Sequence, residues 1–122
     1  MSNSDLVVNA FLARKRYSCY ERKVKIDSKG KAILLIFDYP MAVLTKDGRM
    51  FFKELSIGVT SVVSSQFYAL LNGISSERNG AWRAYSRWQG TFYGNKWTGE
   101  WVEVFANDSP VNILNYQNPF EI

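Results

Sequence analysis

The segment 31–55 constrains the fold most strongly, because turn residues divide it into three apolar runs. Asp47-Gly48 lies between two of these runs, and this dipeptide is a strong signal for a β-hairpin because both residues tolerate positive φ. Asp38-Tyr39-Pro40 separates the first run from the second. Since proline has no N–H and restricts the residue before it, we expect a bend, a bulge or a crossover there. The segment therefore predicts antiparallel strands joined by short turns.

The preceding residues extend this pattern into a meander of four antiparallel strands. Residues 17–26 alternate in polarity, which is the pattern of one strand with a single buried face. A turn over 28–31, in which Gly30 can take a positive φ, then leads into the apolar run 32–37. A further strand is expected over Trp97–Phe105, where large side chains again alternate.

Two helices are expected to cover one face of this sheet. Ser4 or Asp5 can begin the first, over residues 5–15, because either side chain accepts hydrogen bonds from free backbone N–H groups. The second spans about residues 61–72, and Gly73 stands where a C-terminal cap is expected. The 122 residues therefore predict a single α+β domain, with one or two helices packed on one face of an antiparallel meander of four or more strands.

The composition removes the commonest catalytic and metal-binding chemistry. The chain has no histidine and a single cysteine, so a His-activated nucleophile and a classical zinc site are excluded. Asp27, Asp38 and Glu54 could serve a metal-dependent nuclease, but a charged turn explains Asp27 more simply. Glu100 and Glu103 are expected to face solvent. We expect no catalytic residue, no metal and no cofactor, and therefore no enzymatic activity.

Positive charge is concentrated in the N-terminal half. The net charge is +4, and residues 1–55 hold eleven Lys and Arg against six Asp and Glu. Cations attract phosphate, and the neighbouring Tyr17 and Tyr20 could stack on bases. The alternative is a solvated helix end and strand face, with both tyrosines packed inward. The candidate residues for binding an anion or a nucleic acid are Arg14, Lys15, Arg16, Arg22, Lys23 and Lys25.

Aromatic residues make up 16% of the chain, which is more ring area than a small core usually needs. Trp, Tyr and Arg dominate the energetics of many protein interfaces, so we expect part of the central aromatic cluster to bind a partner protein. The alternative is that half of these rings complete the core. A third alternative is a cleft that sequesters a nucleotide, with Arg83 or Arg87 on its phosphate. The candidate partner-binding residues are Trp82, Arg83, Tyr85, Arg87, Trp88, Tyr93 and Trp97.

Three short motifs, spread over residues 7–71, resemble those of short proteins encoded by bacteriophages and plasmids. The motifs are Val8-Asn9-Ala10-Phe11, Tyr17-Ser18 and Thr60-Ser61-x-x-Ser64-Ser65-Gln66. The resemblance implies a mobile-element origin, and small non-enzymatic proteins of such elements often inhibit host defence, as anti-CRISPR proteins do. The first expectation is therefore an inhibitor that docks on a host protein, for example a CRISPR-Cas effector or another nucleic-acid-handling complex. Direct nucleic-acid binding is the second expectation.

The expected location is the cytoplasm of the host cell. No apolar run approaches the ~20 residues that span a bilayer, and the first five residues are polar, unlike a signal peptide. We therefore expect no membrane partner. A homodimer is a further expectation, because an open antiparallel sheet has edges that must be covered or paired.

Overall fold

The computed structural model describes residues 2–53, 101–104 and 115–122, together with six single helical positions between them. These six positions are Val62, Ser65, Gln66, Ala69, Leu70 and Gly73. The elements are α1 (Asn3–Leu12), β1 (Tyr17–Cys19), β2 (Arg22–Ile26), β3 (Ala32–Ile36), β4 (Tyr39–Leu44), β5 (Met50–Lys53), β6 (Trp101–Val104), β7 (Asn115–Tyr116) and the 3-10 helix η2 (Pro119–Glu121).

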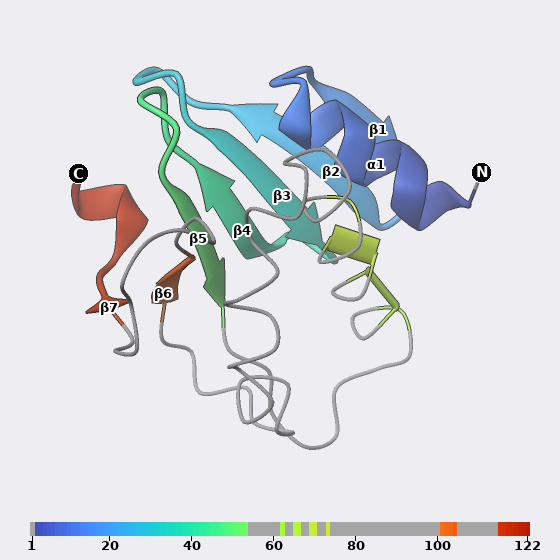
Figure 1. The fold of residues 1–122 in the computed structure, drawn as a ribbon. Helices are drawn as coiled ribbons and strands as arrows, with labels where there is room; N and C mark the ends of the chain where they lie inside the picture. The colour runs from blue at the N-terminus through green and yellow to red at the C-terminus, as the bar shows by residue number, and fades with distance from the viewer. Residues whose placement is uncertain are drawn as a thin grey trace.

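The described strands form one antiparallel sheet in which each strand pairs with its neighbours in the chain. The strand order is β1-β2-β3-β4-β5-β6-β7, and α1 packs across β1, β2 and β3 on one face (Figure 1). The expected α+β architecture, a helix on an antiparallel meander, is confirmed. The predicted strand at Trp97–Phe105 contains β6, which is the part of that range that the structure describes.

The prediction of a single strand over residues 17–26 was wrong. Tyr20 and Glu21 form a tight turn between β1 and β2, so Cys19 pairs with Arg22 and the meander gains a strand. Tyr20 takes a positive φ of 55°, which reverses the chain. The alternation of polarity continues through the turn, and the turn contains none of the Gly or Asn residues that mark such positions in a sequence.

The structure selects the bulge among the alternatives for the region of Pro40. Leu34 pairs with Ala42, whereas Leu35 pairs with Pro40, so β4 carries one extra residue at that point. The predicted Asp47-Gly48 turn is confirmed, with Gly48 at φ 95° and a 2.8 Å hydrogen bond from the Thr45 N–H to the Arg49 carbonyl.

Helix α1 begins and ends earlier than the sequence predicted. Ser2 caps it, and its hydroxyl accepts a hydrogen bond from the Asp5 N–H at 3.1 Å, while the Asp5 carboxylate accepts from the Ser2 N–H. This reciprocal pair is a capping box, with Asp5 inside the helix rather than at its cap. The helix ends at Leu12, and Arg14 takes a positive φ of 56° in the connection to β1.

The main core lies between α1 and the sheet. Val7, Val8 and Phe11 of α1 are buried against strand residues such as Leu34 and Phe52, and Leu70 joins the same cluster. A second cluster on the other face of the sheet contains Val43, Phe51 and Trp101.

Gly73 is not the C-terminal cap that the sequence predicted. It has helical geometry, and a Cβ atom there would lie 2.4 Å from the Cγ1 atom of Val8. The glycine is needed because this backbone approaches α1 too closely to leave room for a side chain.

Candidate anion-binding site

Three segments that are distant in the sequence meet at one end of the sheet. The Arg14 guanidinium donates to the Thr45 carbonyl at 2.6 Å, which fixes the chain after α1 against the β4–β5 turn. A Cβ atom on Gly30 would lie 3.3 Å from the Lys46 side chain, so the β2–β3 and β4–β5 turns are neighbours. Both turns lie at the upper end of the sheet in Figure 1.

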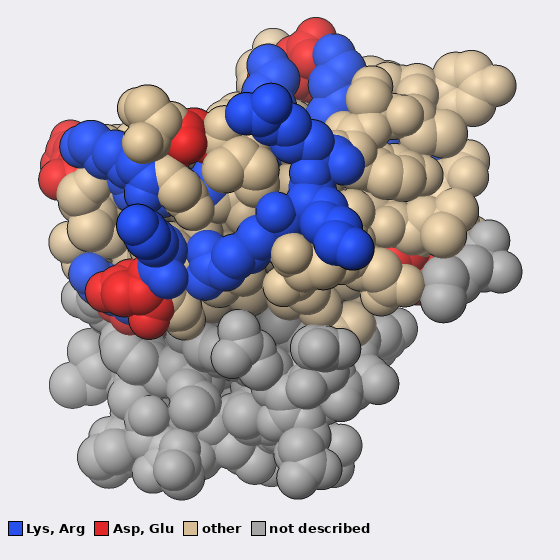
Figure 2. All heavy atoms as spheres, turned by 90° about the horizontal axis from the view of Figure 1, so that it is seen from above, with Lys and Arg blue, Asp and Glu red and all other residues tan. Residues whose placement is uncertain are grey.

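This assembly gathers positive charge, and we call it the basic end. Figure 2 views it directly and shows Lys and Arg side chains in a curved band across it. We define the basic end by five exposed cations, none of which forms an ion pair with another residue that the structure describes. They are Lys15, Arg16, Lys25, Lys29 and Lys46.

The two acidic residues at the basic end are held by hydrogen bonds within their own turns. The Asp27 carboxylate accepts from the N–H groups of Lys29 and Lys31, each at 2.9 Å. The Asp47 carboxylate accepts from the Thr45 hydroxyl, and this bond is the main reason that the pKa of Asp47 is lowered below its usual value. Both carboxylates therefore stabilise their own turns, and neither forms an ion pair with an exposed cation of the basic end.

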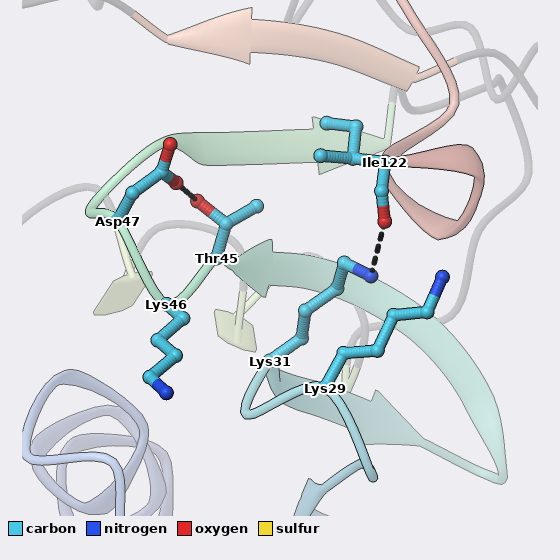
Figure 3. A pocket seen from close by; sticks show the side chains of 6 residues that line it. All are labelled: Lys29, Lys31, Thr45, Lys46, Asp47 and Ile122. Atoms are coloured by element: carbon cyan, nitrogen blue, oxygen red, sulfur yellow. Dashed lines mark hydrogen bonds between the residues drawn. The ribbon is translucent and has the colours of Figure 1, made fainter.

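A pocket of about 290 Å³ lies between the two turns, but its lysines do not converge on one point. Lys31 is buried, and its Nζ donates to the main-chain oxygen of Ile122 at 2.9 Å. Figure 3 shows the Lys29 amino group on the same side as Ile122, whereas the Lys46 side chain points the other way, toward α1. The charges are spread along a surface, and this arrangement suits an extended polyanion better than a single small anion.

A shallow groove of about 500 Å³ continues from the basic end along the β1–β2 hairpin. Arg16, Tyr17, Ser18, Lys23, Val24 and Lys25 line it. The hairpin ends at Tyr20, a residue that is 85% exposed. The groove therefore runs from the exposed cations of the basic end toward Tyr20, and its lining ends at Ser18 and Lys23, just before the turn.

The structure separates the six predicted anion-binding residues into two groups. Lys15, Arg16 and Lys25 are exposed at the basic end, where the prediction placed a site. The other three cations already have partners. Arg14 donates to the Leu44 and Thr45 carbonyls, Arg22 donates to Glu21 at 2.5 Å and Gln66 at 2.9 Å, and Lys23 pairs with Asp38 at 3.0 Å.

Lys29 and Lys46 belong to the basic end, although neither was among the predicted anion-binding residues. Each stands in a polar turn that contains a glycine, and a lysine in a hairpin turn is placed at the end of a sheet. The sequence thus held a signal for both positions. What it could not show is that these two turns lie next to each other and next to residues 14–16.

The carboxylates considered for a nuclease are not assembled. Asp27 and Asp38 stand at opposite ends of β3, and Glu54 lies outside the described residues. Asp38 is held by Lys23, whose hydrogen bond and charge lower the pKa of its carboxyl. Within the described part of the chain, no three His, Cys, Asp or Glu residues come close enough to hold a metal ion.

Glu103 does not face solvent as expected. Its side chain is 9% exposed, and both carboxylate oxygens accept from the Arg49 guanidinium, at 3.0 Å and 2.8 Å. Arg49 is therefore not one of the cations of the basic end, because its charge is already paired with that of Glu103.

The predicted partner-binding cluster lies outside the described residues. This applies to Trp82, Arg83, Tyr85, Arg87, Trp88, Tyr93 and Trp97. Docking of a host protein through these side chains, including inhibition of a CRISPR-Cas effector, stays a prediction, as does the nucleotide cleft that would use Arg83 or Arg87.

Comparison with known proteins adds no relative: no family model, no curated protein and no solved structure matches this chain. Of the helical residues that the structure describes, none belongs to a helix with the length and apolar character needed to cross a bilayer.

Proposed function

We propose that this protein is a non-catalytic nucleic-acid-binding protein whose basic end contacts the phosphate backbone. The observation that supports this function best is the convergence of five exposed cations, from separate segments, on one end of the sheet. A phosphate backbone is a regular array of negative charges, and a spread surface of lysine and arginine side chains complements it without any base contact.

The distribution of the positive charge favours nucleic-acid binding over a role in solubility alone. A net charge of +4 would serve solubility equally well if the cations were scattered. Here the β3–β4 turn at the opposite end of the sheet carries Asp38, which neutralises Lys23, while the cations of the basic end keep their charge. The molecule therefore presents one face with a positive potential to an approaching polyanion.

The test is the salt dependence of binding to labelled DNA and RNA, measured by fluorescence anisotropy. If three to five of these cations neutralise phosphates, log K should fall against log salt with a slope of about −2 to −4.5, steeper for a duplex than for a single strand. Lys25→Gln and Lys46→Gln should each weaken binding and each reduce the size of the slope by roughly one.

Lys53→Gln is the control. It removes one positive charge at the end of β5 that lies away from the β4–β5 turn and outside the groove. We expect a change in slope well below that of Lys25→Gln. Binding that is absent, or that does not respond to salt with either nucleic acid, would contradict the proposed function.

A further inference from the structure

We infer that the nucleic acid bound by this protein is single-stranded, and that it follows the groove of the β1–β2 hairpin toward Tyr20, whose ring stacks on a base. This inference rests on the proposed function and deepens it, because it names the class of nucleic acid and the path that it takes. Three features of the hairpin support it: the cations that it shares with the basic end, the exposure of the ring and the geometry of the turn.

The basic end and the groove share two cations. Arg16 and Lys25, two of the five cations that define the basic end, are also lining residues of the groove. From Ile26 back to Arg22, β2 covers about 14 Å, given the rise of an antiparallel strand. A backbone held at Arg16 and Lys25 can therefore reach the turn at Tyr20 within a few nucleotides.

Tyr20 is presented to solvent by a turn that is itself fixed. Tyr20 is 85% exposed, and the Glu21 carbonyl beside it accepts a hydrogen bond from the Phe37 N–H of the adjacent turn at 2.9 Å. The β1–β2 turn is thus tied to the β3–β4 turn, and the ring stands on a supported part of the backbone.

The turn leaves the ring of Tyr20 outside the core. Its φ of 55° lies in the left-handed region, which the pairing of β1 with β2 imposes on the turn. An exposed aromatic side chain adds little to the core, so the face of this ring is available for stacking on a base.

A single strand is the occupant that uses both features at once. In a duplex the base faces are covered by their neighbours, so an exposed ring finds no partner, whereas a single strand offers unstacked bases. Phosphate contacts alone would favour the duplex, because its charge density is higher. Stacking on the Tyr20 ring should therefore make the protein prefer a single strand, although charge alone would favour the duplex.

The experiment compares labelled oligo(dT) with a duplex of the same length, at one salt concentration, for the wild type and two Tyr20 variants. Tyr20→Gly removes the ring and suits the positive φ, so the turn should be retained. We expect this variant to lose about tenfold in affinity for oligo(dT) and to keep its affinity for the duplex. Tyr20→Phe should keep the single-strand affinity, since the stacking face is unchanged.

Tyr116→Gly is the matched control, because Tyr116 is an exposed tyrosine on β7, away from β1 in the strand order. It should leave both affinities unchanged. If the wild type binds the two probes equally, prefers the duplex, or keeps its oligo(dT) affinity in Tyr20→Gly, the inference is overturned while salt-dependent binding still supports the proposed function. Absence of binding to both probes would contradict the proposed function itself.

Discussion

The Arg49 side chain contacts residues from three different segments. Its guanidinium donates to both oxygens of Glu103 and to the Gln117 side chain at 2.8 Å, and it lies 5.1 Å from the centre of the Phe51 ring. Glu103 holds the pKa of Arg49 above its usual value, chiefly through the side-chain hydrogen bonds. One residue thus ties β5 to β6 and to the segment after β7, by a geometry that a lysine could not reproduce.

Arg49→Ala and Glu103→Ala should destabilise the fold to different extents. Arg49→Ala removes two charge-assisted hydrogen bonds from the buried Glu103 carboxylate, and we expect a loss of about 2 to 3 kcal/mol in the free energy of unfolding. Glu103→Ala should cost about 1 kcal/mol, because the Arg49 side chain is 32% exposed and can bind water instead.

Denaturant unfolding of both single variants and of the double variant measures the coupling between the two side chains. Arg49→Lys is the control that keeps the charge and removes the paired geometry. Equal losses for Arg49→Ala and Glu103→Ala would show that burial of the carboxylate does not decide the cost.

Asp47 should make stability depend on pH in the acid range. Its folded pKa is lowered from 3.8, first by the hydrogen bond from Thr45, so the charged form is favoured in the folded state. The stabilisation is present above pH 3.8 and is lost as the pH falls through the lower folded pKa. Asp47→Asn can accept the same hydrogen bond without titrating.

The variant should therefore show a smaller fall in Tm than the wild type when the pH is lowered below 3.8. Thermal unfolding followed by circular dichroism across this range measures the difference, with Asp5→Asn as a control at a distant carboxylate of α1. Parallel curves for the wild type and Asp47→Asn would contradict the assignment.

Whether a turn contains glycine decided whether that turn could be predicted from the sequence. Asp47-Gly48 and Gly30 place glycine at the positions of positive φ, and both turns were predicted. Tyr20 and Phe37-Asp38 also take positive φ, but they contain neither glycine nor asparagine. Their conformation is imposed by the pairing of the flanking strands, which is a tertiary effect that local preference does not report.

The close approach of Gly73 to α1 can be tested directly by substitution. Gly73→Ala would place a methyl group 2.4 Å from the Val8 Cγ1 atom, so the Val8 side chain or one of the two backbones must shift. We expect a loss of about 1 to 3 kcal/mol in the free energy of unfolding, although alanine favours a helix more than glycine does. Adding Val8→Ala to Gly73→Ala should restore part of the lost stability, because it removes the clashing methyl group.

Denaturant unfolding of the two single variants and the double variant provides the measurement. The clash predicts a double variant that is more stable than the sum of the separate losses implies. Additive losses would mean that Gly73 is not held against Val8.

Composition predicted that the chain carries a basic site, and only the fold shows where that site lies. The N-terminal half was recognised as basic, but local sequence could not show that Arg14 and Arg22 are occupied by internal partners. Nor could it show that Lys29 and Lys46 stand side by side, because that depends on how the hairpins pair. Charge can be read residue by residue, whereas the surface it forms is set by contacts between distant segments.

The strand order has a consequence for how the protein folds. Strands β1 to β5 are joined by short turns, so their pairing closes small loops and can form early. β6 pairs with β5 only after residues 54–100 have been brought round, at an entropic cost of about 3 kcal/mol. Until then the edge of β5 is not paired with β6, and β6 of a second chain can occupy it when the chains are concentrated enough to compete with the tethered strand. Refolding at high concentration should therefore yield strand-exchanged dimers that dilute refolding avoids.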